Sequence, residues 1–177
     1  MRWLLALAFV GFAARPADAC GVWRMKDPER KLDISWLINS ASIEKGGKRL
    51  AALYLDIESK QGIRVVTSKQ VVFDIKGGKI LRYGAVVGKI DADGTVAFGK
   101  KKFTIELVKN PNPPHPSMPD YKLTVKRGDD VVIESDDASA LCAAMQGPRD
   151  PLWGDDQERE EIRRRVIYYL EWREFGM

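Results

Sequence analysis

The chain has 177 residues, of which 29 are Lys or Arg and 25 are Asp or Glu, so its formal net charge is +4. This length suits one domain with a substantial hydrophobic core and leaves little chain for a second domain. The small positive excess is well below the charge density of nucleic-acid-binding domains, and we therefore predict no nucleic-acid partner.

Residues 1–19 have the pattern of an export signal. Arg2 precedes an apolar run of 12 residues, Trp3–Ala14, and Ala17-Asp18-Ala19 forms an A-x-A cleavage site just before Cys20. The run is shorter than the roughly 20 apolar residues that a helix needs to cross a bilayer. We therefore predict a mature chain without a transmembrane segment, in a periplasmic or secreted location.

The chain has two cysteines, Cys20 and Cys142. In an oxidising compartment two cysteines favour a single disulfide, and a bond that closes so long a loop is worth about 5 kcal/mol in the chain-entropy model. The alternative is a bacterial lipoprotein anchored through Cys20. Asp18 stands where such a processing site has a small neutral residue, and Ala17 lacks the bulk of the usual leucine. We therefore predict the Cys20–Cys142 disulfide.

Between residues 32 and 135 apolar and polar residues alternate, which predicts antiparallel strands with one buried face. The predicted inward-facing sets are Ala51, Leu53, Leu55 and Ile57; Val71, Phe73 and Ile75; Phe103, Ile105 and Leu107; and Tyr121, Leu123 and Val125.

Turn signals separate these runs. Gly46-Gly47, Gly77-Gly78, Asp93-Gly94 and Gly128-Asp129 each lie between two predicted strands, and such pairs tolerate the positive φ of tight hairpins. Four hairpins imply about eight strands. With no helical pattern between them, the strands predict a mainly β fold, an antiparallel meander forming a sandwich or partly closed barrel. Further glycines are predicted to form bulges or corners, namely Gly84, Gly88, Gly94 and Gly99.

The last third of the chain is different in character. Residues 110–120 contain five of the nine prolines and predict an exposed, stiff connection. Residues 138–146 predict a short helix, and Asp155–Phe175 predicts an amphipathic helix with acidic residues at its start. The predicted organisation is a β-rich domain over residues 20–147, with the helical segment 148–177 packed on it.

Groups that could carry out catalysis are few. His115, the single histidine, lies in the proline-rich connection without a partner at a recognisable spacing. Asp91-Ala92-Asp93-Gly94 offers carboxylates but lacks the third acidic position and the closing Glu of a calcium loop, and a hairpin turn explains it fully. We predict no catalytic, cofactor-binding or metal-ligating residues. Carboxylates across a cleft keep a small hydrolase open as an alternative.

Two basic runs, Lys100–Lys102 and Arg163–Arg165, would suit an anionic envelope polymer or lipid headgroups. The favoured interpretation is simpler. For the first run, lysine on a strand edge opposes edge-to-edge aggregation of sheets. For the second run, Glu160 and Glu161 precede Arg164 and Arg165 by four residues, a spacing that favours ion pairs on a helix.

Three aromatic residues on the last helix, Tyr168, Trp172 and Phe175, are predicted to form a contact surface, although they could instead complete the core. We predict a non-enzymatic binding or envelope-associated module whose partner is a protein or an envelope polymer. A β-barrel carrier of a small apolar ligand is the other alternative. Gly21-Val22-Trp23 resembles the Gly-x-Trp of the first lipocalin strand, but three residues at a cleavage site identify no family.

Overall fold

The computed structural model describes residues 23–37, 40–56, 64–67, 71–112, 121–138 and 155–176. The predicted signal peptide, both cysteines, His115 and residues 139–146 of the predicted short helix lie outside this set. Exported location, the disulfide and the lipid anchor therefore stay predictions.

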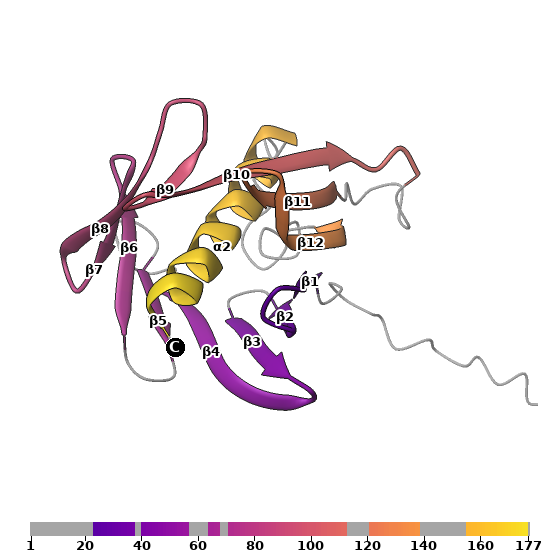
Figure 1. Cartoon of the computed structure of the whole chain (residues 1–177), viewed down its shortest axis with the longest axis horizontal. Helices are drawn as coiled ribbons and strands as arrows, with labels where there is room; N and C mark the ends of the chain where they lie inside the picture. The colour runs from indigo at the N-terminus through magenta and orange to yellow at the C-terminus, as the bar shows by residue number, and fades with distance from the viewer. Residues whose placement is uncertain are drawn as a thin grey trace, which may run out of the picture.

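The described chain is mainly β, with one helix (Figure 1). Its elements, in chain order, are β1 (Trp23–Asp27), β2 (Leu32–Leu37), β3 (Ser40–Lys45), β4 (Lys48–Asp56), β5 (Arg64–Thr67), β6 (Val72–Lys76), β7 (Lys79–Arg82), β8 (Ala85–Ile90), β9 (Val96–Phe98), β10 (Lys101–Lys109), β11 (Tyr121–Arg127), β12 (Asp130–Ala138) and α2 (Asp155–Phe175). Twelve strands are therefore described where the turn signals predicted about eight.

Each strand pairs antiparallel with the next one along the chain, and β12 returns to pair with β1, where Lys26 lies opposite Glu134. The meander thus forms a closed barrel, which confirms the predicted mainly β class. Ser135 strengthens the closing seam, because its hydroxyl accepts a hydrogen bond from Trp23 Nε1 at 3.1 Å and donates one to the Arg24 carbonyl.

The four predicted hairpin turns are all present, and they join β3 to β4, β6 to β7, β8 to β9 and β11 to β12. The higher strand count comes partly from turns at two predicted corners. Gly84 and Gly99 adopt φ of +80° and +60° in tight turns, where glycine avoids a Cβ clash. Gly88 has a different role, because it lies beside a register shift in β7–β8 and the Phe98 ring packs against it.

Alternation places the predicted apolar sets inside the barrel. Buried members of these sets are Ala51, Leu53, Leu55, Phe73, Phe103, Ile105, Leu107, Tyr121, Leu123 and Val125. Full burial of such side chains contributes roughly 1.5–3 kcal/mol each, so these faces supply much of the folding free energy.

The helix α2 runs through the interior of the ring of strands (Figure 1). All nine residues from Arg165 to Arg173 are buried, and nine residues make about two and a half helical turns. A helix buried on every side has protein all around it. The prediction of a helix over Asp155–Phe175 is confirmed, but α2 is enclosed by the β domain and has no solvent-facing side along this stretch.

Aromatic and charged contacts tie α2 to several parts of the wall. The Tyr168 ring lies 5.6 Å from the ring of Phe73 on β6, and the guanidinium of Arg165 lies 5.9 Å from the ring of Trp36 on β2. The strands and the helix therefore share one core.

Candidate functional site

The barrel has two unlike ends, because consecutive connections of a meander alternate between them. At the end that holds the C-terminus of α2 lie the short turns 28–31, 83–84 and 99–100, and we call it the clamped end. At the other end lie the turns 77–78 and 91–95 beside the N-terminal half of α2, and we call it the pocket end.

At the clamped end, Arg173 holds α2 to the wall. Its Nε donates to Asp27 Oδ2 at 2.7 Å, Nη2 donates to Glu29 and Nη1 donates to Glu174 at 2.8 Å. The Tyr169 hydroxyl donates to the same oxygen of Asp27 at 2.8 Å. Asp27 and Arg173 are both fully enclosed, so each charge depends on these partners.

Two further cations complete this network, which we call the Arg173 clamp. Arg30 donates from Nη1 to the Arg173 carbonyl and so satisfies one of the carbonyls that a helix leaves free at its C-terminus. Lys101 on β10 forms an ion pair with Glu174 at 2.5 Å. The last turn of α2 is thus held to three parts of the wall, namely β1, the turn 28–31 that follows β1, and β10.

Hydrogen bonds within the clamp shift the pKa values of its charged groups toward the ionised forms. Burial raises the pKa of Glu29 and of Glu174, but the hydrogen bonds that Arg173, Arg127 and Lys101 donate outweigh burial and hold both below their ordinary value. Burial lowers the pKa of Arg173, yet its carboxylate partners raise it overall. Each ionised group of the clamp is therefore stabilised by its neighbours.

Glu171 is an exception near this end. Its Oε1 accepts a hydrogen bond from Arg82 Nη1 at 2.9 Å, whereas Oε2 has no partner among the described residues. Burial raises the pKa of Glu171, and Arg82 offsets only part of that rise.

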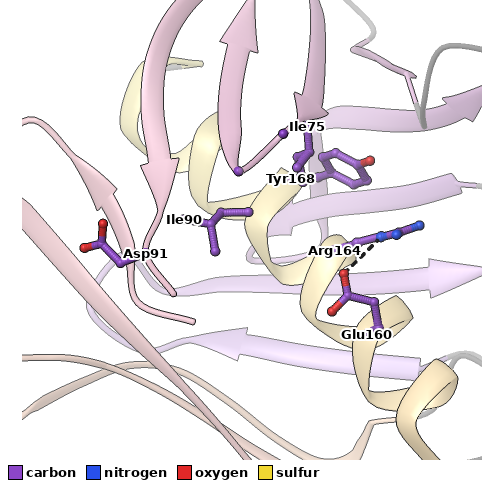
Figure 2. A pocket seen from close by; sticks show the side chains of 8 residues that line it. Ile75, Ile90, Asp91, Glu160, Arg164 and Tyr168 are labelled. Atoms are coloured by element: carbon purple, nitrogen blue, oxygen red, sulfur yellow. Dashed lines mark hydrogen bonds and ion pairs between the residues drawn. The ribbon is translucent and has the colours of Figure 1, made fainter. Parts of the chain in front are cut away.

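A pocket of about 450 Å³ opens at the pocket end (Figure 2). This volume falls within the range of small-molecule sites. It is lined by Ile75, Gly77, Gly78, Ile90, Asp91, Glu160, Arg164 and Tyr168.

One wall of the pocket is a stripe of α2, with Glu160, Arg164 and Tyr168 four residues apart and so on one helical face. Ile75 and Ile90 come from the ends of β6 and β8 and, with the Tyr168 ring, give the pocket an apolar centre (Figure 2). Burial raises the pKa of Tyr168 well above its ordinary value, so its hydroxyl stays neutral.

Ion pairs flank this apolar centre. Arg164 Nε lies 3.3 Å from Glu160 Oε1 on α2, and Lys89 Nζ lies 2.8 Å from Asp91 Oδ1 beside β8. In Figure 2 the Asp91 carboxylate points away from α2, on the opposite side of the pocket from Glu160. The two carboxylates therefore do not converge on a common point.

The acidic residues of the turn 91–95 have local roles. Asp93 Oδ1 accepts a hydrogen bond from the Thr95 backbone N–H at 2.9 Å, and this bond lowers the pKa of Asp93. Within the described residues no group of three His, Cys, Asp or Glu side chains could hold a metal ion.

The predicted contact surface on α2 needs correction. Tyr168 and Trp172 are only 1% and 4% exposed, whereas Phe175 is 41% exposed. The alternative, in which these aromatics complete the core, holds for the first two, because the wall surrounds α2. Phe175 packs edge-on against Phe98 at a centroid distance of 5.7 Å, and the Arg82 guanidinium lies 5.8 Å from the centroid of its ring.

The two basic runs also differ in their surroundings. On α2 the predicted ion pairs are confirmed, with Arg164 Nε 3.3 Å from Glu160 and Arg165 Nη1 2.9 Å from Glu161. Of the strand run, Lys101 is held in the Arg173 clamp, while Lys100 and Lys102 are exposed.

The buried charges were missed at the sequence level. One signal was present, because Asp27 follows Trp23 and Met25 at the inward-facing spacing of β1. For Arg173 and Glu171 no comparable signal exists, since a charged residue on a helix is ordinarily placed on the solvent side.

Comparisons of the chain with protein-family models, with curated proteins and with solved structures found no match. Of the residues described, none belongs to a helix with the length and hydropathy required to cross a membrane.

Proposed function

We propose that the protein is a non-enzymatic binding module of a periplasmic or secreted location, with its ligand site in the pocket at the pocket end. The observation that carries this proposal is the position of the pocket. It opens where the N-terminal half of α2 meets the ends of β6 and β8, beside a barrel interior that α2 itself occupies.

The filled interior argues against the carrier alternative. A barrel that carries an apolar ligand needs an empty lumen, whereas here the side chains of Ile167, Tyr168, Tyr169 and Leu170 take up the centre. A ligand of this barrel is therefore expected at its mouth.

The orientation of the carboxylates argues against the hydrolase alternative. A carboxylate-dependent glycosidase places two acids about 5 to 10 Å apart on either side of one bond. Asp91 points away from the helix, and Glu160 is engaged by Arg164 (Figure 2).

The pocket suits a compact apolar group that carries a polar end. Ile75, Ile90 and the Tyr168 ring offer apolar contact, while the flanking ion pairs can exchange partners with the ligand. Exposed ion pairs are worth little, so such an exchange costs little.

Titration with the fluorescent probe anilinonaphthalene sulfonate, an apolar ring system with one anionic group, tests the site. We expect saturable binding at one site. Ile90→Ser, which removes apolar contact, and Ile90→Trp, which fills the space, should each weaken binding about tenfold, or about 1.4 kcal/mol.

Val131→Ser is the matched control, because Val131 is exposed on β12, away from the pocket. Thermal unfolding of each variant shows whether it is folded. Unsaturable binding, or equal affinity of both Ile90 variants and the control, would overturn the proposal.

A further inference from the structure

A row of lysines crosses the outer wall from the turn 77–78 at the pocket end to the start of β10. Lys76 on β6 lies directly opposite Lys79 on β7, and Lys79 lies directly opposite Lys89 on β8. Lys89 then pairs with Ala97 on β9, which pairs with Lys102 on β10. We call Lys76, Lys79, Lys89 and Lys102 the lysine row.

All four side chains are exposed. They point outward, because their strand neighbours Ile75, Ile80, Ile90 and Phe103 contribute to the core. Strands β6 to β10 are consecutive neighbours in the wall, so the row follows one line around the barrel.

Like charges directly opposite each other on neighbouring strands are destabilising. Two such contacts in succession, Lys76 to Lys79 and Lys79 to Lys89, therefore cost stability. A tight turn accounts for the first contact, because Lys76 and Lys79 flank Gly77-Gly78 in a hairpin. It does not account for Lys89.

The row is only partly neutralised. Lys89 pairs with Asp91 at 2.8 Å, and the charge of Lys102 contributes to the lowered pKa of Asp93, after the larger effect of the Thr95 hydrogen bonds. Neither Lys76 nor Lys79 forms an ion pair with any described residue. A positive excess therefore remains in the row.

We propose that the lysine row binds a linear anionic polymer, such as a polysaccharide or polyphosphate of the cell envelope. This inference goes beyond the proposed pocket, because it concerns the outer face of the wall and a different ligand. Neighbouring strands lie about 4.8 Å apart, so the row spans about 19 Å from β6 to β10.

The geometry of the row favours a polymer over a membrane. A flexible chain can follow one line of charges around a curved wall, whereas a flat lipid surface touches such a wall along a narrow strip. Attraction of this kind is electrostatic, and it weakens steeply with salt as bound counterions are released.

The test is retention of the mature chain on immobilised heparin, a linear polyanion, together with binding to soluble long-chain polyphosphate at several salt concentrations. The triple variant Lys76→Gln, Lys79→Gln, Lys102→Gln, which leaves the Lys89–Asp91 pair beside the pocket intact, should elute at clearly lower salt. Its slope of log affinity against log salt should fall by roughly two to three units, about 0.7–0.9 for each charge lost.

The chain supplies a matched control in a second Lys-Gly-Gly-Lys hairpin. Lys45 lies directly opposite Lys48 across Gly46-Gly47, at the turn between β3 and β4. The control variant Lys45→Gln, Lys48→Gln, Lys122→Gln removes the same net charge from exposed positions outside the row. We expect it to change retention much less than the row variant.

Two outcomes would overturn the proposal. Equal loss of retention in both triple variants would mean that only net charge matters. Binding to vesicles rich in phosphatidylglycerol that depends on the row, without row-dependent polymer binding, would assign the row to a membrane. The row variant should still bind the fluorescent probe, which separates this inference from the proposed pocket.

Discussion

The two ends of the barrel hold the same helix by different means. At the clamped end, Arg173 meets Asp27 in a fully enclosed ion pair with a contact of 2.7 Å, and Lys101 adds a link to Glu174. At the pocket end the ion pair between Arg164 and Glu160 joins two residues of α2 to each other and is partly exposed.

This difference shows what buried charge does in the fold. Apolar contact between α2 and the wall would tolerate small shifts along the helix axis, whereas the Arg173 clamp sets one depth and one rotation. A buried ion pair is weak evidence for stability, and we hypothesise that this one fixes the position of the helix.

The largest loss of stability is expected when the Arg173 clamp loses the buried carboxylate of Asp27. Asp27→Asn removes the carboxylate partner of Arg173 that is fully enclosed, and breaking one partner of a buried pair costs about 3–5 kcal/mol. Urea unfolding followed by tryptophan fluorescence measures the change. A loss below about 1 kcal/mol, typical of an exposed pair, would contradict a clamp.

The next largest loss of stability is expected from crowding at Gly88 on β8, in the barrel wall between the two ends. A Cβ added at Gly88 would lie 2.6 Å from Phe98 Cδ1 and 2.8 Å from the Ala97 carbonyl oxygen, and the carbonyl cannot turn aside. We expect Gly88→Ala to lower the free energy of unfolding by about 1–3 kcal/mol, as overpacking does.

Gly47→Ala is the control for this variant. Its Cβ would meet no atom within 4 Å, although its φ of +76° carries backbone strain of about 1–2 kcal/mol. Thermal unfolding of both variants compares crowding at Gly88 with backbone strain at Gly47, and a loss at Gly88 below about 1 kcal/mol would contradict the close approach of Phe98.

Acid should weaken the clamped end in particular. The folded-state pKa values of Glu29 and Glu174 lie below their ordinary 4.5, so their contribution is present above about pH 4.5 and is lost as the pH falls through the lowered values. Glu171 acts in the opposite sense, because its pKa is raised and protonation at falling pH favours the folded state.

Urea unfolding at a series of pH values tests the predicted direction of the change in stability with pH. The chain should lose stability below about pH 4.5, and Glu29→Gln should flatten that loss. The effect of Glu29 alone is small, because its side chain is 46% exposed and solvent screens it. An unchanged acid slope in Glu29→Gln would show that Glu29 has no part in the clamp.

The sequence predicted local structure better than it predicted the interior. Alternation identified inward residues such as Phe73 and Leu123, and four residue pairs that contain glycine located four hairpins, because these signals depend on near neighbours. The position of α2 was not predictable in the same way. Arg173 and Asp27 lie 146 residues apart, and on the helix alone a buried arginine has the same appearance as a solvated one.

The candidate site was also predicted only in part from the sequence. Ile75 was predicted to face inward, and Gly77-Gly78 was predicted as a turn, but the pocket forms only when these meet Arg164 and Tyr168 of the helix. These residues come together because the meander closes around α2. The lysine row likewise depends on strand register, which alternation fixes only within each strand.

The smallest effects are expected at the pocket end, and they give the sharpest contrast between two adjacent residues. Glu160 forms an ion pair with Arg164 at 3.3 Å, and its side chain is 55% exposed. Glu161 accepts hydrogen bonds from Arg164 at 3.1 Å and from the buried Arg165 at 2.9 Å. Glu160→Ala should therefore change the free energy of unfolding by no more than about 0.5 kcal/mol. Glu161→Ala should cost more, because it removes a carboxylate from a buried guanidinium. Urea unfolding of the two variants measures both values, and equal losses would mean that solvent screens the pocket end of α2 as far as Arg165.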